Sequence, residues 1–476
     1  MRGFRLGFGL GPGSRGNTAL ESLLATLKRE GIYDKLDALY VTDNLSEATS
    51  LRNRVADAYH LTKSGTVTWD AGYGFKSDGS TGYLDTGYNT NSAPGALGLN
   101  SGHIGFYSMT EAREIAVDFG SSSVHLSAGY GTDSQILAKF HETSASYAGG
   151  TEIRSLGHFM MSRGSASSYR VLDNGALVEA KSIAPVAAAD NNLRAFIWPV
   201  GGYVSSKRLA AMHFGAHLSD AEALTLKTAI EDYLTALVPG WDVFMIAGQS
   251  NTLWAQSYDY SLDAGDERVW ARRTDGTWGV AETGLDHFYK GTDRIGFGLH
   301  FAKSHYAGAQ LSGGRRVMLV PCGMASSSFE AGDWTNGTGT YWTQAVARAN
   351  EAMALPGARF RGILWHQGEN DAGSQIPSAI TNYQSRLDAA LNGFRSAITG
   401  ATNCPIVVGG LADDFVDYFG TDSETVQAII EDTPNRIANC AYASSAGLDT
   451  TDTVHFTAAA QRTFAGRYYS AWASLS

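Results

Sequence analysis

Two patterns of hydrophobic and polar residues divide the chain near Pro239 and Gly240. Before this point, short segments such as HIGFYSM and SSVHLSAGYG alternate apolar and polar residues, and Gly, Asn, Ser and Asp separate them. Period-two alternation between turn residues indicates antiparallel strands. Asp173, Asn174 and Gly175, between YRVL and LVEA, predict a hairpin turn. Many such strands at short spacing predict a β-sandwich or jelly roll.

A helix closes this first half. Ser219 and Glu222 have the spacing of a capping box, and apolar residues then recur on one helical face up to Leu237, before Pro239 ends the helix. We therefore expect a domain boundary here. Residues 1–16 are interpreted as a flexible lead-in, residues 17–239 as the β-sandwich, and residues 240–476 as a second domain.

After Gly240 the pattern changes to apolar strands that alternate with loops and long helices. Strands are predicted over residues 242–247, 315–321, 362–366, 405–411 and 436–443, with helices clearest over 340–354, 378–397 and 457–474. Uninterrupted apolar strands between helices indicate an α/β domain whose parallel sheet is covered on both faces. The ligand crevice of such a sheet lies beyond the carboxyl ends of its strands.

Composition narrows the classes of function. A chain of 476 residues predicts two or three domains, and a net charge of −11 argues against a nucleic-acid partner bound through its phosphates. No apolar stretch approaches the roughly 18 residues of a membrane span, and no signal peptide is recognisable, so neither a membrane partner nor secretion is predicted. The three cysteines, Cys322, Cys404 and Cys440, lack metal-ligand spacing and are interpreted as small core residues.

One motif near the N-terminus imitates a dinucleotide site. GPGSRG, residues 11–16, fits Gly-x-Gly-x-x-Gly, and a helix-like stretch follows it. Pro12 lies inside the motif, however, and the segment before it is glycine-rich where a strand would be needed. We therefore interpret this stretch as part of the lead-in and predict no cofactor.

Polar residues suited to acyl transfer follow the strands of the second half. Ser250 comes after the first strand, and Asp452 and His455 lie three residues apart near the C-terminus. A serine nucleophile needs a base, and the base needs a carboxylate that fixes its tautomer; these three residues supply those roles. The backbone N–H groups of Ser250 and Gly323 and the side-chain amide of Gln367 are the candidate donors to an oxyanion.

These residues also resemble a known family. The blocks are Gly248-Gln249-Ser250-Asn251, Gly323 after the second strand, WHQGEN at residues 365–370, and Asp452-Thr453-Val454-His455. In this order they resemble the SGNH hydrolase superfamily, and more closely its branch of sialate O-acetylesterases and acetylxylan-esterase-like carbohydrate esterases. The resemblance covers about half of the chain, from Trp241 onwards.

The resemblance implies a flavodoxin-like three-layer sandwich of five parallel strands and a metal-independent esterase that removes acetyl groups from sugars. Carried over, Ser250 is the nucleophile, His455 the base and Asp452 its partner, with Ser250, Gly323 and Gln367 in the oxyanion hole and Gln249, Asn251 and Glu369 in support.

The sequence departs from that family's pattern in two places, at Cys322 and at Gln367, and leaves several roles open. Cys322 stands before Gly323 where the second block usually reads Gly-Gly, and Gln367 is preferred to Asn370 for the oxyanion hole. Asp449 and Glu369 compete with Asp452 as the acidic partner, although Glu369 is expected to brace its loop. His366 and Glu369 lack a third ligand, so no metal site is predicted.

The first half resembles, more loosely, the concanavalin A-like or laminin-G-type jelly rolls of phage tail and other carbohydrate-contacting proteins. The segments that carry this resemblance are KLDALYVTDN, GYGFKSDGSTGYLDTGYN and SRGSASSYRVLDNG. It implies a carbohydrate-binding domain, an association with a phage tail, and a homo-oligomer or attachment to a virion.

We therefore expect a carbohydrate O-acetylesterase that acts on an acetylated polysaccharide or a sialic-acid-type glycan. Two alternatives stay open at this stage. One is a structural or adhesive glycan-binding virion protein with an inactive esterase fold, and the other is a lipase or thioesterase on the same fold.

Overall fold

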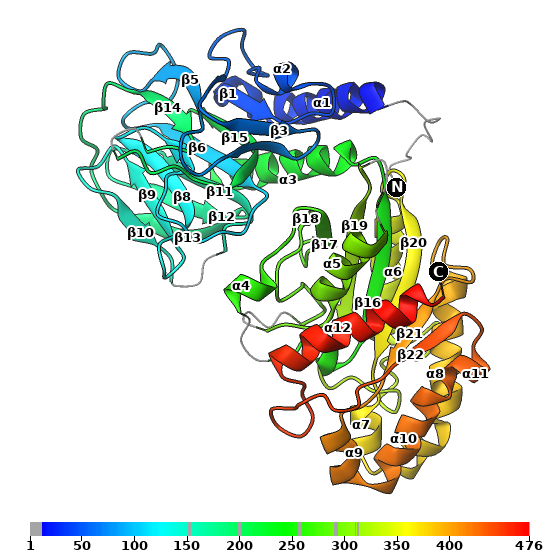
Figure 1. Cartoon of the computed structure of the whole chain (residues 1–476). Helices are drawn as coiled ribbons and strands as arrows, with labels where there is room; N and C mark the ends of the chain where they lie inside the picture. The colour runs from blue at the N-terminus through cyan, green and yellow to red at the C-terminus, as the bar shows by residue number, and fades with distance from the viewer. Residues whose placement is uncertain are drawn as a thin grey trace. The chain divides into compact units, whose positions relative to one another are not determined.

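The computed structural model describes residues 12–150, 154–198, 201–255, 259–289, 294–309, 311 and 314–475. The chain divides into two compact units, residues 1–237 and 238–476 (Figure 1). Within the described residues, no helix combines the length and the apolar character that a membrane crossing requires.

The N-terminal unit is built on two antiparallel sheets. The first contains, in spatial order, β13 (Ala176–Lys181), β12 (Tyr169–Asp173), β11 (Gly157–Arg163), β6 (Gly102–Ser108), β15 (Arg208–Gly215), β4 (Gly74–Ser77) and β3 (Val67–Asp70), with β1 (Leu36–Val41) also paired to β15. The second contains β10 (Ser146–Ala148), β9 (Gln135–Phe140), β8 (Val124–Tyr130), β7 (Phe119–Gly120), β14 (Asn192–Ala195), β5 (Tyr83–Asn89) and β2 (Thr62–Ser64). The predicted sandwich of antiparallel strands is confirmed.

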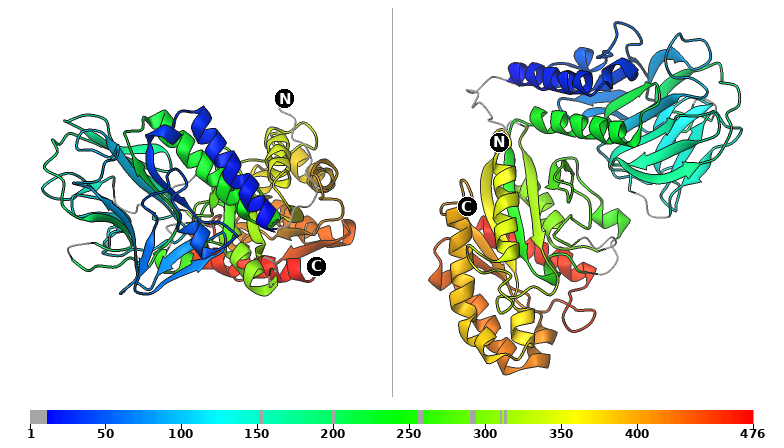
Figure 2. Two further views of the ribbon diagram at one scale, coloured as in Figure 1. Left: turned by 90° about the horizontal axis from the view of Figure 1, so that it is seen from above. Right: turned by 180° about the vertical axis from the view of Figure 1, so that it is seen from behind.

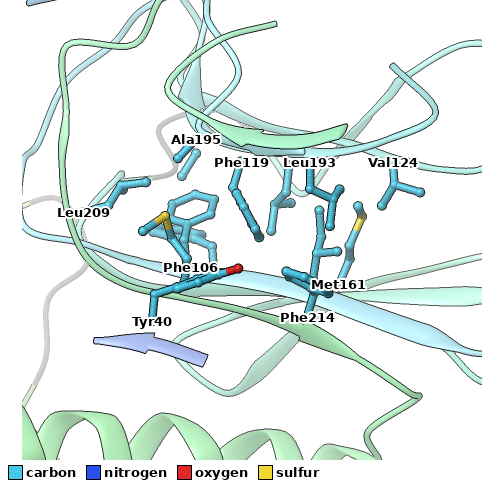
Figure 3. Packing of buried hydrophobic residues seen from close by; sticks show 14 of the residues in the cluster. Tyr40, Phe106, Phe119, Val124, Met161, Leu193, Ala195, Leu209 and Phe214 are labelled. Carbon is cyan, nitrogen blue, oxygen red and sulfur yellow. The ribbon is translucent and has the colours of Figure 1, made fainter. Parts of the chain in front are cut away.

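Alternate residues of the two sheets form the core of this unit. Ile104 and Phe106 of β6 are fully buried, as are Phe119 of β7 and Leu126 of β8 in the facing sheet. Figure 3 shows side chains of both sheets, among them Phe106 and Phe119, pointing into one apolar layer. The period-two pattern of the sequence therefore reports which side of each strand faces the core.

The predicted hairpin turn and helix cap are both present. Asn174 and Gly175 have φ angles of 49° and 82°, as a type I′ turn between β12 and β13 requires. Helix α3 (Asp220–Leu237) begins after Ser219, whose N–H donates to Glu222 Oε2 at 2.9 Å. Short helical segments α2 (Glu47–Ser50) and η1 (Tyr33–Lys35) complete the unit.

Helix α1 (Pro12–Arg29) begins earlier than the sequence pattern suggested. Residues 1–11 of the expected lead-in, including the first glycine of GPGSRG, lie outside the described residues. The remaining lead-in residues, 12–16, are helical. Proline is well tolerated in the first turn of a helix because that turn has no partner for its N–H.

The C-terminal unit contains a mixed sheet of seven strands among the residues that the structure describes. Its order is β18 (Trp278–Val280), β17 (Val269–Arg272), β19 (Arg316–Gly323), β16 (Trp241–Gly248), β20 (Arg359–His366), β21 (Ile406–Gly409) and β22 (Cys440–Ala443). All neighbours pair in parallel except β17 and β18. The five expected strands are present, but the expectation of a wholly parallel five-stranded sheet was wrong, and a flavodoxin-like arrangement stays a prediction.

Helices cover both faces of this sheet. Figure 1 shows α12 (Ala458–Ala473) and α5 (Gly298–Ala309) on one face, and the view from behind in Figure 2 shows α6 (Thr340–Met353) and α8 (Pro377–Ala397) on the other. On the first face, Trp472 of α12 packs edge to face on Phe244 of β16, with ring centroids 5.4 Å apart. The remaining helices are α4 (Tyr260–Asp263), α7 (Glu369–Gly373), α9 (Asp413–Phe419), α10 (Thr421–Glu431) and α11 (Thr433–Arg436).

The three cysteines are buried and unpaired. Cys322 ends the apolar part of β19, and burial raises the pKa of its thiol to about 12. A thiol with that pKa carries almost no thiolate at neutral pH, so Cys322 is a packing residue.

Candidate active site

The turn after β16 places Ser250 at the carboxyl edge of the sheet. Gly248 has a φ of 128°, and a Cβ atom at this position would lie 1.9 Å from the carbonyl oxygen of His366 in the adjacent strand β20. Only glycine fits there. Gln249 N–H donates to the same carbonyl oxygen at 2.8 Å, and Ser250 then opens the short 3₁₀ helix η2 (Ser250–Thr252).

Ser250, His455 and Asp452 form a continuous hydrogen-bonded relay. The Oγ of Ser250 lies 3.0 Å from Nε2 of His455, and Nδ1 of His455 lies 2.8 Å from Oδ2 of Asp452. With Nδ1–H donating to the carboxylate, Nε2 is the nitrogen free to accept the serine proton. The structure thus joins Ser250 to a residue pair that lies about two hundred positions further along the chain.

The loop that carries His455 is shaped around Asp452. Oδ1 of Asp452 accepts the N–H groups of Val454 at 3.2 Å and His455 at 2.8 Å, and Thr453 between them has a φ of 74°. Burial alone would raise the pKa of Asp452, but the hydrogen bonds from His455 hold it below the usual value. Asp452 therefore stays ionised, as a partner of His455 must.

Neither rival carboxylate contacts His455. Asp449 accepts the N–H of Thr457 through its backbone carbonyl, at 2.9 Å. Glu369 uses Oε1 to accept from His366 Nε2 at 2.7 Å and from Asn251 Nδ2 at 2.6 Å. Among the described residues, Asp452 is the carboxylate that pairs with His455.

Asn251 connects the nucleophile turn to the histidine loop. Its Nδ2 also donates to the carbonyl oxygen of Val454 at 3.0 Å, and its Oδ1 accepts the N–H of Phe456 at 3.1 Å. These two bonds hold the backbone on both sides of His455. Asn251 therefore fixes the position of the base relative to Ser250.

Glu369 contacts the side chain of Asn251, which links the turn after β16 to the loop that carries His455. Burial raises its pKa, but the charge and hydrogen bond of His366 outweigh that effect and lower it. Glu369 accepts from the side chains of Asn251 and His366, and the expected bracing of its loop stays a prediction.

Two of the three expected oxyanion donors are engaged elsewhere. The N–H of Gly323 donates to Nδ1 of the buried His287 at 2.7 Å. The amide nitrogen of Gln367 donates to Asp371 Oδ2 at 2.5 Å and to Gln249 Oε1 at 3.2 Å. The expectation that both groups face an oxyanion is wrong for this structure.

Donors that remain open lie on the nucleophile turn itself. In the described part of the chain, the N–H of Ser250 donates to no protein acceptor, as expected at the start of a helix. Oε1 of Gln249 accepts from Gln367 Nε2 and from the N–H groups of Gly368 and Asn370, each at 3.2 Å. Among those same residues, Nε2 of Gln249 has no hydrogen-bond partner and can donate to an oxyanion. The sequence pattern did not suggest Gln249 as an oxyanion donor.

A pocket of about 240 Å³ opens beside the relay. Its lining combines the nucleophile turn, the two loops and an aromatic wall: Gln249, Ser250, Ser326, Glu369, Asn370, Gly373, Phe415, Phe419, Val454 and His455. Neither Gly323 nor Gln367 belongs to this lining. Ester chemistry at Ser250 would therefore take place at the wall of a small, partly apolar pocket.

Metal ligands do not gather in the described residues. No group of three or more His, Cys, Asp or Glu side chains has a geometry that could hold an ion. His366 and Glu369 are instead hydrogen-bonded to each other, and Glu369 also accepts from Asn251.

The chain was compared with known proteins and structures. No curated protein matches it. Similar solved structures include a protein from Arabidopsis thaliana (19% identity, TM-score 0.43, covering 49% of this chain and 98% of that one) and NanS (17%, 0.40, 50% and 98%). A novel carbohydrate acetylesterase from Xanthomonas citri is also similar (16%, 0.35, 66% and 70%). These TM-scores are too low to carry an argument.

The comparison with family models is more informative. Residues 240–474 match the family described as carbohydrate esterase, sialic acid-specific acetylesterase. These residues span all the strands and helices that build the site. The resemblance predicted from the four sequence blocks is thereby confirmed, and the C-terminal half of the chain carries a domain of this carbohydrate esterase family.

Proposed function

We propose that the C-terminal unit is a serine-dependent O-acetylesterase that removes acetyl groups from a polysaccharide or a sialic-acid-type glycan. The observation that carries this proposal is the relay Ser250–His455–Asp452 at the wall of the pocket. The family match supports carbohydrate acetylesterase activity in general terms. The relay adds a mechanism, because it supplies a nucleophile, a base and an orienting carboxylate in contact with one another.

The reaction would proceed in two halves. His455 Nε2 takes the proton of Ser250 as Oγ attacks the acetyl carbonyl carbon, and it returns that proton to the departing sugar oxygen. The product of this half is a free sugar hydroxyl and an acetyl group esterified to Ser250. Water, deprotonated by the same nitrogen, then attacks the acetyl-enzyme and releases acetate.

The oxyanion that forms in each half needs donors aimed at it. The Ser250 N–H and Nε2 of Gln249 are the groups that the structure leaves open for this role. The three N–H donors on Oε1 fix the amide of Gln249, so its nitrogen requires little reorganisation. Each such donor typically contributes about 10²–10³-fold to kcat.

The size of the pocket favours a short acyl group. About 240 Å³ is at or below the lower end of the range for pockets that hold drug-sized ligands. An acetyl group fits in this pocket beside Phe415 and Phe419, and little of the pocket remains for an acyl chain much longer than about eight carbons. This supports an acetylesterase over a lipase.

The proposal is tested by the rates at which the wild type and Ser250→Ala hydrolyse p-nitrophenyl acetate and p-nitrophenyl octanoate. We expect the wild type to prefer acetate and the variant to lose at least about 10³-fold in kcat, because the triad acts as a unit. A preference for octanoate would favour a lipase. No hydrolysis of either ester by the wild type would favour the inactive, glycan-binding alternative.

Two expectations from the first half of the chain stay predictions. One is that the sandwich binds carbohydrate, and the other is that the protein belongs to a phage tail, with an oligomer or virion attachment.

A further inference from the structure

Arg294 lies close to the relay, and no carboxylate of the described residues pairs with it. Its guanidinium carbon is 3.9 Å from the centroid of the Trp254 ring. No ion pair with Arg294 forms among the residues that the structure describes. The arginine is partly exposed, so its charge remains available to an anion from solution.

The backbone fixes this arginine beside the tryptophan. Ala255 and Ile295 form an antiparallel bridge, with the N–H of Ala255 donating to the carbonyl oxygen of Ile295 at 2.9 Å. Trp254 and Arg294 are the residues just before this pair. In an antiparallel bridge these two positions are diagonal neighbours, within reach of aromatic and long side chains, so the bridge brings the two residues close enough for the contact.

Trp254 also touches the catalytic base. Its ring centroid lies 6.1 Å from that of His455 and 5.7 Å from that of Tyr289, whose side chain is 46% exposed. Neither aromatic residue belongs to the lining of the pocket beside Ser250, which we call the acyl pocket. His455 thus lines the acyl pocket and also contacts Trp254. Trp254, Tyr289 and Arg294 together form an aromatic and cationic surface, which we call the platform.

The chemistry of this platform suits an acidic sugar. A guanidinium stacked on an indole keeps its in-plane N–H donors, which pair with a carboxylate through two hydrogen bonds. Aromatic rings present apolar faces against which the C–H groups of a pyranose can pack. The two ring contacts place Arg294 within roughly 10 Å of the His455 ring, a distance comparable to the length of one sugar residue.

We propose that Arg294, held on Trp254, binds the carboxylate of an acidic sugar, a sialic or uronic acid, whose acetyl ester is presented to Ser250. This inference rests on the proposed esterase function. It adds that the sugar carries a carboxylate and that Arg294 binds this group. Tyr289 forms the exposed side of the same platform. Neutral acetylated sugars are then poorer substrates, because they leave the guanidinium unpaired.

The test measures acetate release from O-acetylated N-acetylneuraminic acid and O-acetylated galacturonic acid, each compared with the primary amide of its own carboxyl group. We expect the wild type to prefer at least one acid over its amide by about 10-fold or more in kcat/KM, as a charge-assisted pair would give. In Arg294→Gln this preference should fall to about one, mainly through a higher KM for the acid.

The matched control is Arg359→Gln. Arg359 is an exposed arginine at the first residue of β20, at the opposite end of the strand from His366. This variant removes the same charge from the unit and should keep the preference of the wild type. A similar loss in both variants would reduce the effect to net charge and overturn the proposal.

The outcome separates this inference from the esterase function. Hydrolysis of p-nitrophenyl acetate by the wild type, without preference for either acid over its amide, would overturn the platform and leave the esterase intact. An acid preference that persists in Arg294→Gln would also overturn it. Without hydrolysis of any ester, the esterase function fails first; binding of N-acetylneuraminic acid to the wild type and Arg294→Gln, measured by calorimetry, would then decide the role of Arg294.

Discussion

At the scale of the residue, the candidate site depends on the contact between Ser250 and His455, which come from distant parts of the chain. Ser250 and His455 were identified because polar residues follow apolar strands at one edge of a parallel sheet, and the structure brings them within 3.0 Å. Gly323 and Gln367 were misplaced because other acceptors bind their N–H groups: Gln367 donates to Asp371, four residues away, and to the distant Gln249. The N–H of Gly323 meets His287, 36 residues away, and no local pattern reports that contact.

The choice of acidic partner gives a prediction at this scale. Asp452→Asn should lower kcat by about 10²–10⁴-fold, since the neutral amide neither fixes the tautomer of His455 nor stabilises its charged form. Asp449→Asn should change kcat by less than about 2-fold, because the Asp449 contact uses its backbone carbonyl. Steady-state kinetics with p-nitrophenyl acetate measure both. The reverse ranking of the two variants would reassign the carboxylate.

Asn251 gives a second prediction. Asn251→Asp keeps the shape of the side chain but replaces its Nδ2 donor with an acceptor next to Glu369 Oε1, which lies 2.6 Å away. We expect kcat to fall by about 10–100-fold because the histidine loop loses its anchor at Val454. Adding Glu369→Gln should restore part of the loss by supplying a donor. If the fold-loss in kcat of the double variant equals the product of the fold-losses of the two single variants, Asn251 and Glu369 do not act together.

At the level of elements, the long helices of the C-terminal unit were predicted closely, and two strands at one edge of its sheet were missed. The helices of α6, α8 and α12 appear within one residue of their expected ends, because each has a sustained apolar face and a clear start. Strands β17 and β18 were missed because Arg268, Arg272 and Arg273 interrupt the apolar pattern there, whereas β21, no longer than β17, has an uninterrupted apolar run. The mixed edge of the C-terminal sheet follows from these two strands.

One buried carboxylate holds three helices of the C-terminal unit together. Asp263 at the end of α4 accepts from both Nε and Nη2 of Arg462 in α12, at 2.7 and 2.6 Å, and from His300 Nε2 in α5 at 2.7 Å. Burial alone would raise the pKa of Asp263, but the hydrogen bonds from Arg462 and His300 outweigh that effect. The pKa is therefore below its usual value, and the carboxylate is charged.

Asp263→Asn should therefore lower the free energy of unfolding by about 3–5 kcal/mol, because it leaves the charge of Arg462 without its partner. The control is Asp432→Asn, which removes an exposed carboxylate 3.0 Å from Arg436 and should leave the free energy of unfolding nearly unchanged. Urea denaturation at pH 7 compares the two. Equal losses would show that Asp263 contributes no more than a surface pair.

At the scale of the whole molecule, the change of pattern near Pro239 and the division into two compact units fall at the same place in the chain. Every residue of the relay and of the pocket lies in residues 238–476. That fragment alone should hydrolyse p-nitrophenyl acetate with a kcat within about 3-fold of the full chain. A fragment that folds, as judged by circular dichroism, but is inactive would show that the sandwich takes part in catalysis.

The N-terminal unit should be sensitive to acid. Burial lowers the pKa of His103 and of His125 to about 4 each, whereas an unfolded histidine titrates near 6.5. The contribution of both neutral rings to the free energy of unfolding is therefore fully present above pH 6.5. It is lost as the pH falls from 6.5 toward 4. Each histidine adds a slope of up to about 1.4 kcal/mol per pH unit.

Hydrogen exchange of the sandwich strands at several pH values measures this slope. We expect His103→Gln to reduce the slope of stability against pH by the amount that one buried histidine contributes. A stability that is flat between pH 6.5 and 4.5 in the wild type would show that the buried rings are protonated in the folded state.

Ser250 is the proposed nucleophile of this site, and its reactivity can be measured. The most direct measurement is labelling with an active-site-directed fluorophosphonate, followed by peptide mass spectrometry to locate the adduct. Ser326, which lines the same pocket, supplies the matched comparison. The relay predicts an adduct on Ser250 in the wild type and in Ser326→Ala, and none in Ser250→Ala. An adduct on Ser326, or unchanged labelling of Ser250→Ala, would contradict the account.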